Sequence, residues 1–231
     1  METGLIYHPK AETMGRQELR ELQDRKLRWQ VKRCYENSEF YRERFKRAGI
    51  ELKHIKTGDD MVHVPVVTKQ ELRQEQIDHP PFGRYVVAPK KDWRELHPST
   101  GTTGVPVNTI WSENDVRNIT DVTARTMWGF GVRPGDIIQN GFSYGLWVAG
   151  VAVHYAAQRI GCFTIPIGAA MTQRQIDYLL NPGSDVLICT PSFALHIAET
   201  LRDRGVSPKD LKVRLGSFGG EPGTEAPATR R

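Results

Sequence analysis

The segment whose residue types are best suited to chemistry is a run of hydroxyl groups and glycines at residues 99–104. It reads Ser99, Thr100, Gly101, Thr102, Thr103 and Gly104. Glycines let consecutive backbone N–H groups turn toward a bound anion, and hydroxyls add further hydrogen-bond donors. The run therefore carries the donors needed to hold the phosphate groups of a nucleotide. It is neither a Walker A loop, which ends in Gly-Lys-Ser/Thr, nor a GxGxxG turn.

Composition alone leaves a second interpretation open, a surface loop rich in Ser, Thr and Gly that joins two strands. The flanking sequence favours phosphate binding, because the run lies between predicted strands at 93–97 and 107–111 and closes with Gly104 and Pro106. His97 directly precedes the run. It either orients a ligand carboxylate or the loop, or it is a packing residue. The remaining histidines and the three cysteines show no metal-ligand spacing, so no metal site is predicted.

The elements that must position this loop alternate between strand and helix from residue 107 onward. Predicted strands lie at 107–111, 137–139, 162–166, 186–190 and 213–218, and predicted helices at about 115–128, 146–160, 172–180 and 192–204. Strands such as 186–190 are apolar throughout, which indicates burial on both faces in a parallel sheet. The predicted fold class is therefore α/β, with a mainly parallel sheet flanked by helices. Functional groups should gather at the carboxyl ends of its strands.

The N-terminal part has a different, helical pattern. An amphipathic helix carrying Leu19, Leu27 and Val31 is predicted to stop at Ser38, which would cap a second helix, and Thr68 starts a third. Residues 62–67 are predicted to be extended, and 76–89 to be a loop with one strand at 85–87. We divide the chain into an N-terminal helical arm (1–90), an α/β core for nucleotide and acid (91–225) and an irregular tail (226–231).

Composition and charge exclude several classes of protein. Hydrophobic residues make up 39% and charged residues 26% of the 231 residues, which is typical of a globular chain. No apolar run reaches the ~18 residues of a membrane helix and no secretory signal is visible, so a cytoplasmic location without membrane contact is expected. The net charge is +5, and residues 1–50 hold 12 Lys/Arg against 8 Asp/Glu. Because those charges interleave on a helix, they indicate a solvated surface and not nucleic-acid binding.

The loop, taken with other stretches, resembles the adenylate-forming (AMP-forming) acid–CoA ligases, and within them the phenylacetate–coenzyme A ligase branch. The similar blocks follow in the order of that family: Leu19 to Trp29, Tyr35 to Phe45, Pro65 to Leu72, His97 to Pro106, Tyr144 to Trp147, His154 and Tyr155, Arg159 to Cys162, Ile165 and Pro166, Thr190 to Ser192, and Phe218 to Pro222. The resemblance extends over the chain to about Glu225. It implies the N-terminal part of the adenylate-forming ligase fold.

The resemblance also implies a reaction and its site residues. Residues 99–104 would hold the triphosphate of ATP, with Mg²⁺, while an aryl acid such as phenylacetate forms an acyl-adenylate that coenzyme A then converts to a thioester. The acid pocket would include Tyr144, Gly145 and Trp147, although these residues could equally be core at the start of a helix. The segment Gly219, Gly220, Glu221 and Pro222 would line the adenine and acid sites, or alternatively form a helix-initiating turn.

The chain departs from the family pattern at several places. Val105 and Val107 stand where many family loops carry a lysine, Gly223 stands where Trp is usual, and Pro227 interrupts an expected helix. The family's downstream Mg²⁺-holding Glu, ribose-holding Asp and catalytic lysine are not found in these 231 residues. We therefore expect the isolated chain to be catalytically incomplete and to self-associate or pair with a complementary C-terminal half. Part of a ligase, a stand-alone nucleotide or aryl-acid binding module, and a non-catalytic pairing subunit remain three open interpretations.

Overall fold

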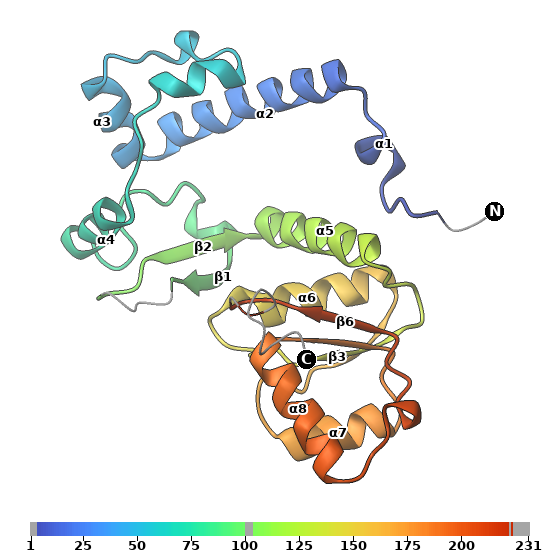
Figure 1. Cartoon of the computed structure of the whole chain (residues 1–231). Coiled ribbons are helices and arrows are strands. Elements are labelled where there is room, and N and C mark those ends of the chain that lie inside the picture. The colour runs from blue at the N-terminus through green and yellow to red at the C-terminus, as the bar shows by residue number, and fades with distance from the viewer. Residues whose placement is uncertain (1–3, 100–103, 222, 224–231) are drawn as a thin grey trace. The chain divides into compact units, whose positions relative to one another are not determined.

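The computed structural model describes residues 4–99, 104–221 and 223. The chain forms two compact units, one of His8–Val116 and one that combines Met1–Tyr7 with Arg117–Arg231. Figure 1 shows the elements of both, and each unit is described by itself below. The domain limits expected from the sequence, with a boundary near residue 90, remain a prediction.

Helices dominate the first unit, as the sequence predicts. They are α1 (Pro9–Glu12), α2 (Arg16–Asn37), α3 (Glu39–Arg47) and α4 (Lys69–Asp78), with short 3₁₀ turns at Leu52–His54, Gly58–His63 and Lys90–Asp92. Ser38 separates α2 from α3, and its Oγ accepts the Tyr41 N–H at 3.3 Å, which confirms the predicted cap. Val31, Phe45 and Ile55 form a small buried core. Among the helices of the described residues, none is both long enough and apolar enough to cross a membrane.

Two strands of the first unit, β1 (Trp93–Pro98) and β2 (Asn108–Ser112), pair as an antiparallel hairpin separate from the parallel sheet. The predicted strand at 85–87 is wrong. Asn108, the first residue of β2, donates its backbone N–H to Gln76 Oε1 (3.0 Å), and its backbone carbonyl accepts from the Tyr85 hydroxyl (2.8 Å). Side chains thus occupy the backbone N–H and carbonyl of Asn108, which a further strand would need for pairing with β2. The extended stretch expected at 62–67 begins only after His63, because Val62 belongs to a 3₁₀ turn.

The second unit contains a four-stranded parallel sheet in the order β4-β3-β5-β6. Its strands are β3 (Ile137–Asn140), β4 (Phe163–Ile165), β5 (Val186–Cys189) and β6 (Leu215–Phe218). Each pair of neighbouring strands runs parallel. This arrangement confirms the predicted α/β class and its mainly parallel sheet.

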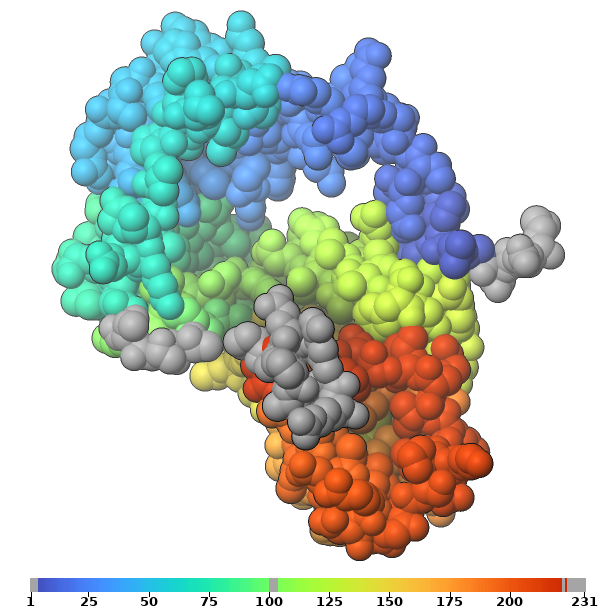
Figure 2. Space-filling view, viewed as in Figure 1, coloured from blue at the N-terminus to red at the C-terminus, as the bar shows by residue number. Residues whose placement is uncertain are grey.

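Helices cover both faces of this sheet (Figure 1). They are α5 (Glu113–Gly129), α6 (Val148–Ile160), α7 (Thr172–Leu180) and α8 (Pro191–Asp203), followed by a 3₁₀ turn at Pro208–Asp210. The strand β5 shows the alternation, since Val186 and Ile188 pack with α5 and α6 whereas Leu187 and Cys189 pack with α7 and α8. In Figure 2 the orange and red residues from α7 to β6 form one closely packed body. Burial on both faces explains why β5 is apolar throughout.

Candidate functional site

The carboxyl edge of the parallel sheet brings together two of the predicted site segments. The ladder continues past the strands, with Gly141 N donating to Ile188 O (2.7 Å) and Gly219 N donating to Cys189 O (3.2 Å). The segment that follows β3 carries Tyr144 and Trp147, and the segment that follows β6 carries residues 219–221. Open parallel sheets bind ligands at this edge.

Asn140 anchors the segment after β3. Its side chain is completely buried, and Nδ2 donates both to the Tyr144 hydroxyl (2.7 Å) and to Gly150 O (2.8 Å). Its Oδ1 accepts the Phe142 N–H at 3.2 Å. One amide therefore holds the end of the strand, the following loop and the first turn of α6 in fixed relation.

Tyr144 presents an apolar ring at this edge because its hydroxyl is already engaged. Besides accepting from Asn140, the hydroxyl lies 3.2 Å from His154 Nδ1, and the two rings meet edge to face with centroids 5.7 Å apart. The residue is 39% exposed. Burial raises the pKa of Tyr144 to about 12, so the phenol is neutral at ordinary pH.

Trp147 meets the predicted glycine segment directly. Its ring packs edge to face on Phe142, with centroids 5.5 Å apart and an interplanar angle of 89°. A Cβ on Gly220 would lie only 2.8 Å from Trp147 Cη2, and Gly220 has φ +88°, so a side chain is excluded there on both grounds. Trp147 is 39% exposed, which is less burial than a core tryptophan would have. A Cβ on Gly145 would meet no atom within 4 Å, so this residue borders open space.

Glu221 ends the glycine segment on the first turn of α8. Its Oε1 accepts the Ser192 N–H at 2.6 Å, and hydrogen bonds from Ser192 lower the pKa of the carboxyl group. A carboxylate at a helix N-terminus satisfies an otherwise unpaired N–H and interacts favourably with the helix dipole. Pro222 lies outside the described residues.

The base of the predicted phosphate loop is closed by Ser99 and Val107. Ser99 N donates to Val107 O (2.8 Å), and Val107 N donates to Ser99 Oγ (2.9 Å). At the other end of the loop, Gly104 has φ +129°, a conformation that favours glycine. Thr100, Gly101, Thr102 and Thr103 lie outside the described residues.

His97 lies on β1 and packs within the hairpin. Its Nε2 is 2.9 Å from Glu95 Oε2, and its ring centroid is 4.2 Å from that of Trp111. The side chain is only 10% exposed. These contacts correspond to the packing alternative of the sequence analysis.

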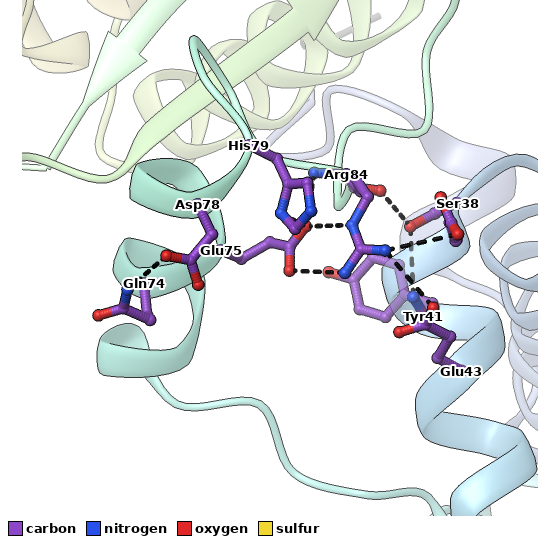
Figure 3. Close-up of polar contacts among 9 residues, drawn as sticks. Ser38, Tyr41, Glu43, Gln74, Glu75, Asp78, His79 and Arg84 are labelled. Carbon is purple, nitrogen blue, oxygen red and sulfur yellow. Dashed lines mark hydrogen bonds and ion pairs between the residues drawn. The ribbon is translucent and has the colours of Figure 1, made fainter.

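A polar cluster in the first unit was missed by sequence reasoning (Figure 3). Arg84 Nε donates to Glu75 Oε1 at 2.7 Å, and the Ser38 hydroxyl donates to Arg84 O at 2.7 Å. Burial raises the pKa of Glu75, but the hydrogen bonds from Arg84 outweigh that effect and leave it lowered. Because the cluster joins the start of α3, the end of α4 and the following loop, we assign it to holding these elements together.

Asn140 and His154 are the residues at the sheet edge that sequence reasoning did not select. A signal was present for Asn140, since Gln139 and Asn140 are polar residues at the end of a strand whose other positions are apolar. Gln139 is bound by the buried Gln175 and Ser184. Asn140 instead turns to the carboxyl edge. His154 belongs to one of the family-like blocks, but helix spacing alone does not show that it faces this loop.

The curated proteins whose sequences match this chain are all phenylacetate-coenzyme A ligases. The chain is 36% identical to a phenylacetate-coenzyme A ligase of Thermus thermophilus over 222 residues, which cover 96% of this chain and 49% of the relative. It is 36% identical to one of Pseudomonas putida and 35% identical to one of Escherichia coli K12, in both cases over 93% of this chain and 48% of the relative. The chain thus spans about half the length of these curated relatives. A scan against protein-family models finds no match.

Solved structures give a consistent result. A 2-hydroxyisobutyryl-CoA ligase in complex with 2-HIB-AMP and CoA superimposes with a TM-score of 0.91 at 31% identity, covering 100% of this chain and 49% of that one. An open conformation of that ligase, also with 2-HIB-AMP and CoA, gives a TM-score of 0.90 at 30% identity. The described fold is therefore that of the N-terminal part of an adenylate-forming CoA ligase.

Proposed function

The chain belongs to the phenylacetate–coenzyme A ligase family, whose N-terminal half it represents, and on this premise we propose that it binds ATP and an aryl acid for adenylation. The observation that carries the proposal is the contact between Trp147 and Gly220 at the carboxyl edge of the sheet. Two segments far apart in sequence, both singled out for the acid and adenine sites, meet there.

The proposed reaction has two steps. The carboxylate of the acid attacks the α-phosphorus of ATP, forming the acyl-adenylate and releasing pyrophosphate. The thiolate of coenzyme A then attacks the acyl carbon, forming the thioester and releasing AMP. Both steps depend mainly on holding reactants in position and on stabilising phosphate charge.

We assign the acid to the wall formed by Tyr144, Gly145 and Trp147. The half-exposed rings of Tyr144 and Trp147 suit an aryl group, which gains from edge-to-face contact. The engaged hydroxyl of Tyr144 makes this wall apolar, which supports phenylacetate or a similar unsubstituted aryl acid. The backbone of Gly219 and Gly220 is assigned to the planar adenine, and residues 99–104 to the triphosphate. His97 is assigned a packing role beside the loop.

ATP is used with Mg²⁺ in the proposed reaction, but this part of the chain is assigned no Mg²⁺ ligand. Within residues 4–99, 104–221 and 223, no group of three or more His, Cys, Asp or Glu side chains comes together that could hold a metal ion.

We further propose that a complementary half or a second copy pairs with the open edge of the sheet. In the described structure β6 pairs with β5 alone, and Phe218 at its end is 44% exposed. Unpaired strand edges and exposed apolar groups promote association. We accordingly expect the isolated 231-residue chain to bind ligands and associate, without detectable ATP–pyrophosphate exchange.

The proposed function is tested by thermal shift of the chain with ATP, AMP, phenylacetate and combinations of them. A ligand that binds only the folded state raises stability by RT ln(1 + [L]/Kd), which is about 2.7 kcal/mol at a hundredfold excess over Kd. We expect stabilisation by ATP and by phenylacetate. Gly104→Val should abolish the response to ATP and preserve the response to phenylacetate, because a branched side chain at φ +129° distorts the loop end.

Gly49→Val is the matched control for this variant. Gly49 also has positive φ (+65°), and a Cβ there would meet no atom within 4 Å. It should lower stability without changing the response to either ligand. An ATP response that persists in Gly104→Val refutes the loop assignment, and a chain that neither ligand stabilises refutes the proposed function.

A further inference from the structure

Tyr144 is the aromatic residue of the proposed acid wall whose polar end is bound within the fold. Its hydroxyl lies between the side chains of Asn140 and His154. A phenol hydroxyl has one proton to donate, and its oxygen also accepts a hydrogen bond. The chemistry of this wall therefore depends on which neighbour receives the proton.

Asn140 can only donate to Tyr144. Its Nδ2 also donates to Gly150 O (2.8 Å), a carbonyl oxygen that can only accept, and its Oδ1 accepts the Phe142 N–H (3.2 Å). Turning the amide by half a rotation would break both of these bonds and leave buried polar groups unpaired. The other Nδ2 proton therefore faces the Tyr144 hydroxyl, whose oxygen accepts it at 2.7 Å.

His154 is then the neighbour that can accept the Tyr144 proton. Its Nδ1 lies 3.2 Å from the hydroxyl oxygen. A neutral imidazole has one N–H and one acceptor nitrogen, so this contact uses the tautomer with the proton on Nε2. The hydrogen bonds thus run in one direction, from Asn140 through Tyr144 to His154. Gly150 and His154 are one turn apart on α6, so one face of that helix holds both ends of this arrangement.

Packing fixes the two rings. The imidazole of His154 lies edge to face against Tyr144 (centroids 5.7 Å apart, 84°) and against Tyr155 (6.2 Å, 80°). The backbone that follows β4 borders the phenol ring, because a Cβ on Gly168 would lie 3.9 Å from Tyr144 Cδ2. Gly168 N in turn donates to Asn140 O at 3.0 Å. The Tyr144 ring is therefore held in place without a ligand, which reduces the entropy lost when one binds.

We propose that His154 is a positioning residue of the acid site, which sets the direction of the Tyr144 hydroxyl proton. By accepting that proton, His154 leaves the wall without a hydrogen-bonding group for a hydroxyl on the ring of the acid. Such a hydroxyl would lose its hydrogen bonds to water and gain none, which weakens binding. The inference rests on the proposed function, since it places the aryl acid against Tyr144. It names the residue that makes the site select an unsubstituted ring.

The test compares binding of phenylacetate with that of ortho-, meta- and para-hydroxyphenylacetate by calorimetry. The wild type should bind at least one isomer, the one whose hydroxyl meets the wall, roughly ten- to hundredfold more weakly than phenylacetate. His154→Phe keeps a ring but removes the acceptor, so Tyr144 can donate to that isomer. The affinity for it relative to phenylacetate should rise roughly tenfold. His154→Asn places an amide oxygen near the position of Nδ1 and should return the ratio to the wild-type value.

Two controls separate the hydrogen bond from general packing. In a Tyr144→Phe background, His154→Phe should leave the ratio of affinities unchanged, because the hydroxyl that it releases is absent. His196→Phe replaces an exposed histidine of α8 and should leave the ratio as in the wild type. Melting temperatures of all variants establish that they are folded.

A second measurement detects the hydrogen bond without any ligand. At about pH 8, where an ordinary imidazole is neutral, nitrogen NMR of isotope-labelled histidine should show His154 with its proton on Nε2. The signal of His154 is the one that is missing from His154→Phe. Its Nδ1 resonance should shift in Tyr144→Phe, because the donor is lost.

The proposal is overturned if the wild type binds every isomer as tightly as phenylacetate, if His154→Phe leaves the ratio unchanged, or if His154→Asn behaves as His154→Phe. An equal change of the ratio in the Tyr144→Phe background, or a proton on Nδ1 of His154 in the wild type, also overturns it. Where phenylacetate binds in these cases, the proposed function stands. A wild-type chain that binds none of the acids refutes the proposed function itself, and the role of His154 in acid binding is refuted with it.

Discussion

Substituting Gly150 by alanine tests how the acid-site segment is held against α6. A Cβ on this buried glycine would lie 2.2 Å from Ser143 O and 2.9 Å from Ser143 C, far inside van der Waals contact. The obstacle is backbone, so no side-chain rotation relieves it. Overpacking costs typically about 1–3 kcal/mol and at times more. Alanine regains up to about 1 kcal/mol of helix propensity.

We therefore expect a net loss of about 2 kcal/mol, seen as a melting temperature lower by roughly 4–8 °C for a chain of this size. The displaced 142–147 segment should also weaken phenylacetate binding. Thermal unfolding and calorimetric titration measure the two effects. Gly145→Ala is the matched control for the stability measurement alone, because its Cβ would meet no atom within 4 Å, and it should change stability by less than about 0.5 kcal/mol. A Gly150→Ala chain that melts within about one degree of the wild type refutes the reasoning, because such a shift corresponds to less than about 0.5 kcal/mol.

Three further predictions concern single side chains. Hydrogen bonds from the Thr68 backbone and from Arg44 lower the pKa of Glu71 to about 2. The stabilising effect of this carboxylate is therefore complete above the ordinary Glu pKa and is lost as the pH falls toward 2. Urea titrations should show Glu71→Gln less stable than the wild type at about pH 7, and the difference in stability should disappear as the pH falls below about 4. Trp147→Ala should weaken aryl-acid binding by about 1–2 kcal/mol, whereas an unchanged affinity in a destabilised variant would assign Trp147 to packing alone. Burial raises the pKa of the Cys189 thiol to about 12, so a thiol reagent at pH 8 should label it only after unfolding, as mass spectrometry of the peptides would show.

The sequence predicts the strands and helices of the second unit well because their periods are strong. The segment 186–190 is apolar throughout and bounded by turns, and the structure has β5 there, buried on both faces. The predicted strand at 85–87 fails because local propensity does not show whether a partner edge is free. The hydroxyl of Tyr85 occupies the carbonyl that a neighbouring strand would use.

Candidate site residues can be selected from the sequence where they lie within one short segment, and not where they come from separate segments. The loop at 99–104 and the glycines at 219–220 are visible as motifs. Asn140, by contrast, acts through hydrogen bonds to Tyr144 and Gly150 that only the turn after β3 creates.

The central position of strands β3 and β5 limits how fast the backbone at the carboxyl edge of the sheet can open. Each is paired on both sides, and β5 is packed against helices on both faces. Amide hydrogens in such strands exchange only when a large cooperative unit opens. The residues that follow, from Asn140 to Tyr144 and from Thr190 to Ser192, are therefore attached to the slowest-opening part of this unit. We therefore expect a ligand that binds at this edge, as proposed, to enter and leave through motion of the loops and not through separation of the strands.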